Sequence, residues 1–445
     1  MDASLPDANA LFRAVDFPAG RPVVVGVSGG SDSLALLHLL AAFTHASSPG
    51  IVPVAVTVDH ALRPESAAEA EAVGRVCAAL GVKHRTLRWQ DAKPSTGLAA
   101  AARLARHRLL AQATREEGAS MVLVGHTRDD LAETAAMRMA RGTGRGDAGI
   151  PPATLYENST WFVRPMLGTR RRDLRAFLAA QGIGWIDDPT NSDRRYERAR
   201  TRLDLAALPD AEREIEALAR RAENAAAMRG QIARNVARIL ARHAAMMSPG
   251  LFRLAPDMLA LDMPDAAVEA LRIVIAIAGG SGHLPDRDRS VDLFRRLGGA
   301  ARLRATLSRA LIDRRDDAIF VLRERRGLPE PGNYVRGAIW DGRFRVRVPG
   351  RLTISGDAAM AERVPAGIPE SLVQAASYAE PAIHAAQPDH DGDVRTTDTS
   401  PSRVAGPWAT FMPSFDHAAA SAAIRMLGGD PPPPLPFRGH NEAAT

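Results

Sequence analysis

The sequence predicts an α/β fold in its first 205 residues, with a parallel sheet covered by helices on both faces. Apolar runs of strand length alternate there with segments whose apolar residues recur at helical spacing, as in parallel sheets. A glycine-rich turn joins the first strand to the first helix, at the place where such sheets bind ligands. Farther along, an alanine-rich segment predicts a helical domain, and short β patterns predict a small α+β C-terminal region.

Eight elements account for the first 150 residues. The predicted strand Val23–Val27 is a continuous apolar run that ends in glycines, which is typical of a buried parallel strand. In the helix Ser31–Ala46, Leu34 and Leu37 recur at helical spacing. The other predicted elements, in chain order, are strand Val52–Val58, helix Ala67–Leu80, strand Val82–Trp89, helix Leu98–Glu117, strand Met121–Gly125 and helix Arg128–Met139.

The chain is long for one hydrophobic core, so several domains are expected. We expect a domain with the parallel sheet and the glycine-rich turn at 1–205, and a helical domain that binds a substrate or acts as a linker at 206–300. A small β-containing region follows at 301–385, with two short strands around Arg314–Asp317. Residues 386–445 are polar or proline-rich and are expected to be disordered or extended.

Composition excludes several classes of protein. Cys77 is the only cysteine, so internal disulfides, cysteine-based zinc sites and iron–sulfur clusters are not expected. The N-terminal residues contain acidic side chains and no long apolar run, so they do not resemble a secretory signal. No stretch of about 18 apolar residues predicts a membrane span. We therefore expect a cytoplasmic globular protein.

The positive charge of the chain is almost entirely arginine. The formal net charge is +6, and the only lysines are Lys83 and Lys93. A genome that favours arginine codons would explain this composition. A phosphate-binding face for nucleic acid would also explain it, because the guanidinium group matches phosphate oxygens. Composition alone does not choose between the two.

The turn after the first strand carries the strongest functional signal. Its sequence is Ser28–Gly29–Gly30–Ser31–Asp32–Ser33, and a helix follows directly. The glycines allow a tight turn, and the helix N-terminus directs N–H groups and a positive dipole at a pyrophosphate. Asp32 is unexpected for anion binding alone but sensible if it holds the Mg²⁺ carried by ATP. A serine-rich helix cap does not explain the whole hexapeptide, and the P-loop lysine is absent.

This hexapeptide after an apolar strand resembles the PP-loop of the ATP pyrophosphatases, which use ATP to adenylate an oxygen and release pyrophosphate. The resemblance implies the adenine nucleotide alpha-hydrolase-like fold. The superfamily includes GMP and NAD synthetases, asparagine synthetases, tRNA thiolases and the tRNA(Ile)-lysidine synthases.

Two further segments resemble the lysidine synthases. The second strand ends in Val58–Arg63, similar to the family's VDHxLR, where Asp59 is expected to contact ribose or adenine; as a turn residue it would be unremarkable. The segment Gly125–Thr134 resembles (A/G)HHxDDxxET, with Thr127 replacing the second histidine. The resemblance gives His126 and Asp130 roles in catalysis, with Asp130 as a second ligand of Mg²⁺. The alternative is that these acidic side chains only interact favourably with the positive end of the helix dipole.

Several arginines fall on other motifs of that family. The segments AAR-x-x-R, RGTG, RPLL and DPSN are matched around residues 101–106, 141–144, 164–167 and 188–191, and further arginines trail the last segment. The resemblance assigns Arg103 to catalysis. It assigns to the substrate or tRNA the side chains of Arg106, Arg141, Arg164, Arg198, Arg200 and Arg202. Surface charge is the alternative for each of them. The resemblance runs from about Val23 to Arg202.

Other classes fit less well. A tRNA thiolase generally needs paired cysteines or a cluster, and Cys77 is alone. GMP synthetase would need a source of ammonia and gives no role to the RGTG and DPTN segments. A non-catalytic tRNA-binding protein would have no reason to retain Asp32, Asp130 and a complete phosphate loop.

The resemblance therefore implies an ATP-dependent ligase that attaches free L-lysine to C2 of the wobble cytidine in isoleucine tRNA with a CAU anticodon. O2 of the cytidine would be adenylated first, and lysidine would form with release of AMP and pyrophosphate. ATP and Mg²⁺ are the implied cofactors. The lysine-binding residues and the oligomeric state stay open, with a homodimer as one alternative.

Overall fold

The computed structural model describes residues 5–46, 50–142, 145–188, 193–347, 350–354, 364–385 and 401–437. The chain forms two compact units. Unit 1 comprises Met1–Gly230 with the short segments Pro413–Phe415 and Pro433–Thr445, and unit 2 comprises Gln231–Met412 and Asp416–Pro432. The four domains expected from the sequence have other boundaries and remain a prediction.

Unit 1 contains the predicted parallel sheet. Six of its strands, in spatial order, are β5 (Ala153–Tyr156), β6 (Thr160–Val163), β4 (Met121–Val124), β1 (Val23–Gly26), β2 (Pro53–Asp59) and β3 (Lys83–Arg88). All neighbours pair in parallel except β5 and β6, which form an antiparallel hairpin. β1 and β4 are buried along their whole length, which explains their unbroken apolar sequences.

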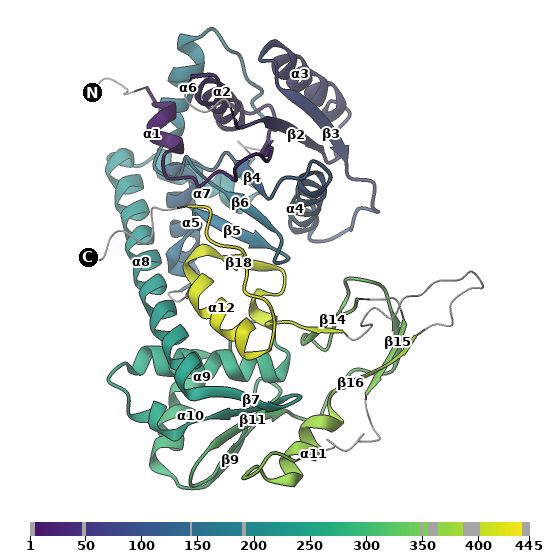
Figure 1. The fold of residues 1–445 in the computed structure, drawn as a ribbon. Helices are drawn as coiled ribbons and strands as arrows, with labels where there is room; N and C mark the ends of the chain where they lie inside the picture. The colour runs from purple at the N-terminus through teal and green to yellow at the C-terminus, as the bar shows by residue number, and fades with distance from the viewer. Residues whose placement is uncertain are drawn as a thin grey trace, which may run out of the picture. The chain divides into compact units, whose positions relative to one another are not determined.

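Helices cover both faces of this sheet. α2 (Ser31–Ala46) and α3 (Ser66–Ala79) lie on one face, and α4 (Leu98–Glu116) lies on the other (Figure 1). The chain moves outward from β1 to β2 and β3, and α4 then carries it back to β4 on the other side of β1. The direction of winding therefore changes between β1 and β4. Ligands of open α/β sheets bind at the strand carboxyl ends at such a point.

The rest of unit 1 packs around that point. Its other helices are α1 (Ala8–Phe12), α5 (Arg128–Ala140), η1 (Arg145–Ala148), α6 (Arg171–Ala180), α7 (Glu197–Ala206) and the first part of α8 (Ala211–His243). α6 packs on α2, and α7 packs on α5. The apolar stripe of α8 at Leu218 and Ala222 packs against Leu131 and Ala135 of α5. That stripe therefore anchors α8 to the catalytic part of unit 1.

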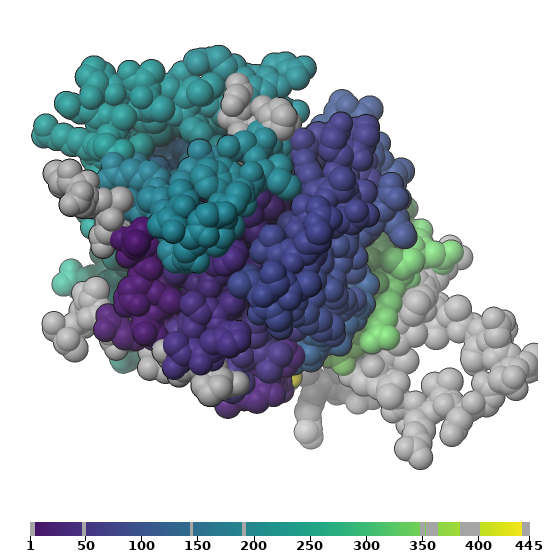
Figure 2. Space-filling model, turned by 90° about the horizontal axis from the view of Figure 1, so that it is seen from above, coloured from purple at the N-terminus to yellow at the C-terminus, as the bar shows by residue number. Residues whose placement is uncertain are grey.

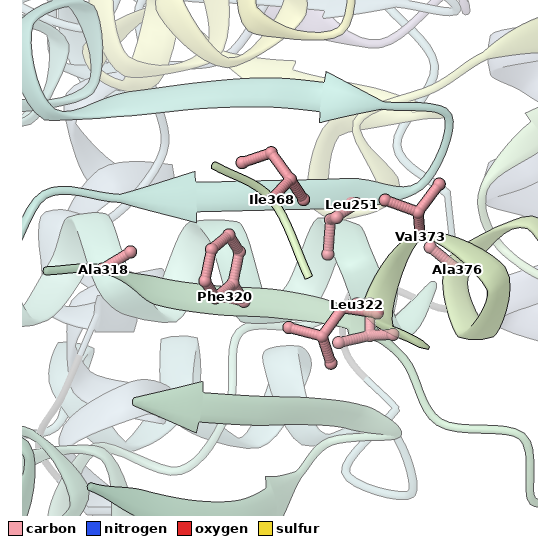
Figure 3. Close-up of a cluster of buried hydrophobic side chains, with 8 residues drawn as sticks. Leu251, Ala318, Phe320, Leu322, Ile368, Val373 and Ala376 are labelled. Carbon is pink, nitrogen blue, oxygen red and sulfur yellow. The ribbon is translucent and has the colours of Figure 1, made fainter. Parts of the chain in front are cut away.

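Unit 2 is built around an antiparallel sheet in the order β7 (Ala244–Ser248), β8 (Leu251–Leu254), β11 (Ile319–Arg323), β10 (Ala310–Arg314) and β9 (Leu303–Leu307). β10 and β11 flank the Arg314–Asp317 turn expected from the sequence. Leu251, Phe320 and Leu322 on one face form a core with Val373 and Ala376 (Figure 3). On the other face the buried α9 (Pro264–Gly279) packs on β10 and β11.

Smaller elements complete unit 2. They are η3 (Pro256–Ala260), α10 (Arg287–Gly299), β12 (Gly332–Tyr334), β13 (Ile339–Trp340), β14 (Phe344–Arg345), β15 (Gly350–Ile354), α11 (Glu370–Tyr378), β16 (Pro381–Ala385), β17 (Ser402–Arg403), η4 (Gly406–Trp408) and α12 (His417–Met426). β18 (Phe411–Pro413) and η5 (Ser414–Asp416) fall at the limits of the units. No helix among the described residues is both long and apolar enough to cross a membrane.

The C-terminal segment differs from its prediction. The sequence predicts a disordered or extended tail from residue 386, and 386–400 and 438–445 lie outside the described residues. Between them, however, α12 is an ordered helix that buries Ala419, Ala420 and Ala423. Polar and proline-rich flanks dominate the composition of this region, but the alanine stripe supplies a helical face that can be buried.

Candidate functional site

The glycine-rich loop lies where the winding of the sheet changes. Gly29 has φ +80°, and a Cβ atom there would lie 2.9 Å from Cδ1 of Ile186. The Ser28 amide donates to Oγ of Ser33 at 3.1 Å, and the Ser33 hydroxyl donates to the Gly30 carbonyl at 3.0 Å. These bonds tie the turn to the first turn of α2. The loop is therefore held in one shape by its own serines.

The end of β4 approaches the same helix closely. A Cβ atom on Gly125 would lie 3.0 Å from the backbone oxygen of Asp32, so glycine is needed for this contact. His126 follows, and α5 begins after Thr127. The approach places the start of α5 beside the start of α2, with both helix N-termini at one edge of the sheet.

Two cavities meet at the loop. The larger one has a volume of about 310 Å³, and its walls mix the apolar Val56, Val58 and Leu110 with charged side chains that include Arg63 and Glu69. The smaller one has a volume of about 230 Å³ and charged walls that include Asp32, Asp130 and Arg171. Both cavities are lined by Ser28, Gly30, Arg106 and Ile186. A space with a partly apolar wall and a strongly ionic space therefore adjoin across the glycine turn.

The segment after β6 closes this region. The amide of Ile186 donates to the Gly29 carbonyl at 2.9 Å, and Arg63 pairs with Asp188 at 3.3 Å. Figure 2 shows this segment, in teal, lying directly against the purple N-terminal residues and the indigo residues of the α3 region. Residues 165–188 thus form one wall of both cavities, although they follow the loop by more than 130 positions in sequence.

Arg171, the first residue of α6, connects the acidic groups of the smaller cavity. Its Nε donates to Oδ2 of Asp32 at 2.9 Å, and its Nη2 donates to Oδ1 of Asp130 at 2.9 Å. Its Nη1 reaches Oε1 of Glu133 at 3.2 Å. One guanidinium therefore bridges three carboxylates from two helices.

Glu133 forms ion pairs with two more arginines. Arg198 Nε donates to Oε2 of Glu133 at 2.9 Å, and Arg202 Nε donates to Oε1 at 2.7 Å. Both arginines come from α7, and both line the smaller cavity. Glu133 is almost fully buried, so these pairs offset the cost of removing its charge from water.

Asp130 is held as a carboxylate. One oxygen caps α5 by accepting from the amide and the hydroxyl of Thr127, both at 2.8 Å. Burial would raise its pKa, but the charges of Arg171 and Arg198 outweigh burial and lower the pKa to about 2. For Asp32 the balance is opposite. Burial outweighs Arg171 and raises the pKa of that carboxyl.

His126 lies beside these carboxylates in the smaller cavity. Its Nδ1 is buried without a hydrogen-bond partner in the described part of the chain. Burial and the charge of Arg164 hold the pKa of His126 well below its usual range, so the ring is neutral near pH 7. A neutral imidazole can accept or donate one hydrogen bond without adding charge.

The arginines predicted on α4 differ in position. Arg106 lines both cavities, and burial lowers its pKa. No carboxylate among the described residues forms an ion pair with Arg106, so its charge is available to an anionic ligand. Arg103 is one turn away and lines neither cavity. Its carbonyl accepts from the ring of His107 at 2.7 Å.

Two other predicted residues, Asp59 and Arg164, are not among the side chains that line the two cavities. Asp59 accepts from the Ala61 amide at 2.7 Å and shapes the turn after β2. Arg164 is buried and donates to the Pro151 carbonyl and the Thr154 hydroxyl, both at 3.0 Å, which fixes the β5–β6 hairpin. Their predicted contacts with nucleotide or tRNA remain predictions.

Two arginines are exposed. Arg141 pairs with Glu197, and Arg200 donates to the carbonyls of Arg194 and Arg195 at 2.9 and 3.1 Å. Of the RGTG segment, residues 143–144 lie outside the described residues, and so do 189–192 of the DPTN segment.

Sequence reasoning did not select Arg171 or Glu133 as site residues. Glu133 stands in the acidic motif three residues after Asp130, and that spacing on a helix is a usable signal. Arg171 lies in the run Arg170–Arg172, and nothing in that run distinguishes it from surface charge. Its place follows only from the packing of α6 on α2.

The chain is similar to known proteins over nearly its whole length. The model of a family described as PP-loop domain matches residues 7–208. The tRNA(Ile)-lysidine synthase of Mesorhizobium japonicum is 45% identical over 453 residues, which cover 98% of each chain. That of Rhizobium meliloti is 37% identical over 97% of each chain. That of Brucella ovis is 40% identical over 75% of this chain and 76% of its own.

Among solved structures, similarity was found to the U34-tRNA thiolase NcsA from Methanococcus maripaludis with its 4Fe-4S cluster. The sequence identity is 15% and the TM-score is 0.41, with 49% of this chain and 77% of that chain covered.

Proposed function

Because the chain belongs to the tRNA(Ile)-lysidine synthase family of PP-loop proteins, we propose that it uses ATP to convert the wobble cytidine of isoleucine tRNA with a CAU anticodon to lysidine. It is an ATP-dependent ligase with a PP-loop ATP-binding domain. The observation that supports this function best is that a cavity with a partly apolar wall and a strongly ionic cavity meet at the glycine-rich loop.

The two cavities suit the two ends of ATP. The larger one offers the apolar side chains of Val56, Val58 and Leu110, against which an adenine base can pack, and polar side chains that can bind its edge. The loop between the cavities offers backbone amides and the N-terminus of α2, which suit a pyrophosphate. Arg106, at the junction, supplies a cation without a carboxylate partner among the described residues. We therefore place adenosine in the larger cavity and the phosphates along Ser28–Ser33.

The donor set of the smaller cavity fits Mg²⁺. Asp32 and Asp130 each direct one oxygen at the same cation, Arg171. Mg²⁺ in ATP sites takes one or two carboxylates and completes its shell with phosphate oxygens and water. No group of three or more possible metal ligands occurs in the part of the chain described, which suits an ion that arrives with its nucleotide. When bound, Mg²⁺ would neutralise charge on the phosphates.

The reaction has two steps. O2 of the cytidine attacks the α-phosphorus, an oxygen–phosphorus bond forms, and pyrophosphate leaves. An amine of free lysine then attacks C2, loses its proton, and AMP departs with O2. Adenylation converts a poor leaving group into a good one. His126 can orient the base or the amine from the same cavity because it is neutral.

Several parts of this function come from the family. Free L-lysine as the second substrate, the CAU anticodon and a cytoplasmic location belong to the proposal. A thiolase is disfavoured because the single cysteine, Cys77, is buried and its pKa is raised to about 11. A thiolate nucleophile is therefore not available there.

The direct test is incubation of the full chain with ATP, labelled lysine and bulk tRNA. We expect label in the RNA, together with AMP and pyrophosphate, only when all three are present. Asp32→Asn is a matched control that keeps the side-chain size but removes the charge. ATP cleavage without incorporation of lysine would contradict the proposed second substrate, and tRNA binding without ATP cleavage would indicate a non-catalytic binding protein.

A further inference from the structure

Arg171 occupies an unusual position for a residue of an ATP site. Its side chain is largely buried and bridges Asp32, Asp130 and Glu133, with the three donor–acceptor distances between 2.9 and 3.2 Å. Asp32 and Asp130 are the two carboxylates that fit Mg²⁺. The guanidinium thus binds the same carboxylate oxygens that a metal ion would need.

We propose that Arg171 is a positioning residue that acts as an internal counter-ion, holding Asp32 and Asp130 in place between catalytic cycles and releasing them when Mg²⁺ arrives with ATP. This inference rests on the proposed function, because it assigns the metal of that reaction to these two carboxylates. The role differs from that of Arg106, which lines both cavities and pairs with no carboxylate in the part of the chain that the structure describes.

The charge balance of the cluster supports the exchange. Asp32 and Asp130 line the cavity of about 230 Å³, and Glu133 adds a third, buried carboxylate beside Asp130. Arg198 and Arg202 bind Glu133 through their Nε atoms at 2.9 and 2.7 Å and approach Oδ1 of Asp130 at 3.5 and 4.0 Å. Asp32 forms an ion pair with Arg171 at 2.9 Å and with no other cation among the described residues. Without Arg171, Asp32 would face Asp130 without a paired cation, which is unfavourable at short range. Either the guanidinium or the metal therefore serves Asp32.

The anchoring of α6 allows the exchange. The Arg171 amide donates to Oδ2 of Asp129 at 2.7 Å, and the guanidinium of Arg170 grips the same carboxylate at 3.1 Å. These bonds hold the backbone of the first turn of α6 independently of the Arg171 side chain. The side chain can therefore leave the two carboxylates by rotation about its own bonds and remain at the cavity.

The test measures the affinity of the full chain, without ATP, for Mn²⁺ as a substitute for Mg²⁺. Binding is monitored through the spectroscopic signal of free Mn²⁺. Arg171→Gln removes the competing cation, so we expect it to bind one Mn²⁺ at least tenfold more tightly than wild type. Arg172→Gln is the matched control: its side chain is exposed and pairs with Glu212 at 2.7 Å, so affinity should not change. The double variant Asp32→Asn with Arg171→Gln should lose the gain.

Unchanged or weaker Mn²⁺ binding in a folded Arg171→Gln protein would overturn the inference, because a merely structural arginine would give that result. If the variant is unstable, its Tm is measured against Mn²⁺ concentration, and we expect Mn²⁺ to raise Tm more than in wild type. If Mn²⁺ did not raise the Tm of the variant more than that of wild type, the inference would also be overturned. Binding of ATP by the wild type is measured separately, so loss of the proposed function is distinguished from loss of this role.

Discussion

Each unit contains a buried acidic centre that three arginines neutralise, but the two centres differ in what else they face. In unit 1, Asp130 and Glu133 meet Arg171, Arg198 and Arg202 at the wall of a cavity of about 230 Å³. In unit 2, Asp341 alone meets three arginines in the interior, and its side chain is fully buried.

In the acidic centre of unit 2, backbone carbonyls accept the remaining hydrogen bonds of the arginines. Arg323 bridges both oxygens of Asp341 and uses its remaining donors on carbonyls, including that of Gly327 at 2.8 Å. Arg343 donates to Oδ2 of Asp341 at 2.8 Å and to the Ala379 carbonyl. The hydrogen-bond donors of Arg323 and Arg343 are therefore taken up by groups of the protein itself. The same side-chain chemistry fixes a turn in unit 2 and lines a cavity of about 230 Å³ in unit 1.

Replacement of Asp32 by alanine gives the largest expected effect, because it removes a carboxylate that faces the cavity. Pyrophosphate release should fall at least ~10³-fold, which corresponds to about 4 kcal/mol of transition-state stabilisation. Binding of tRNA, measured by filter retention, should be nearly unchanged. Unaltered turnover would show that Asp32 takes no part in the chemistry. The acidic centre of unit 1 would then have only a structural role, like that of unit 2.

Asp341→Asn tests the acidic centre of unit 2. The change leaves the buried guanidinium groups of Arg323 and Arg343, and the partly exposed one of Arg309, without their common anion. Breaking a buried pair costs about 3–5 kcal/mol. We expect the urea concentration at which unit 2 is half unfolded to fall clearly. Unfolding is monitored by the fluorescence of Trp340, which neighbours Asp341 in the chain. ATP cleavage per folded molecule should stay at the wild-type rate. A specific loss of ATP cleavage without loss of stability would show that the two centres do not divide the roles in this way.

Much of the fold followed from the sequence, for identifiable reasons. β1 and β4 are buried on both faces, so their apolar runs were continuous and their bounds were recognisable. The glycine-rich loop was recognisable because it lies within six consecutive residues. The β5–β6 hairpin was not expected, and the helix α12 was hidden between polar segments.

The ionic centre could be predicted only in part. Asp32, His126 and Asp130 belong to local motifs and do meet in one cavity, together with Arg198 and Arg202. Arg171 belongs to no local pattern, because its partners lie 139 and 41 residues away in the chain. Its position depends on how α6 packs against α2, which residue spacing does not encode. Conversely, motif resemblance favoured Arg164, whose guanidinium the structure uses to fix a hairpin.

The pH dependence of stability is a third way to sharpen the comparison. The pKa of Asp130 is lowered to about 2 in the folded chain, below its ordinary value of 3.8. Its contribution, on the order of 2 kcal/mol, is therefore fully present above about pH 4 and is lost as the pH falls toward 2. The difference in unfolding free energy between wild type and Asp130→Asn should be constant from pH 7 to 4 and shrink below.

A matched control for that series is Asp204→Asn, whose carboxylate is exposed and pairs with Arg194 on the surface. Exposed pairs contribute little, so its difference from wild type should be small at every pH. If the Asp130 difference grew instead of shrinking in acid, the arginines would not be holding this carboxyl in its charged form.

Arg200 gives the smallest expected effect and separates tRNA binding from the ionic centre. Arg198 and Arg202 face Glu133, whereas Arg200, on the same helix, is exposed and donates only to backbone carbonyls among its contacts in the structure. Arg200→Glu should therefore weaken tRNA binding by about 1 kcal/mol and lower the slope of log affinity against log salt by about 1. Its rate of ATP cleavage at saturating tRNA should equal that of wild type. Arg198→Glu should show the reverse, with ATP cleavage lost first, because it replaces a cation with a carboxylate beside Asp130 and Glu133. Equal tRNA affinity and salt slope in Arg200→Glu and wild type would mean that this face of α7 carries only surface charge.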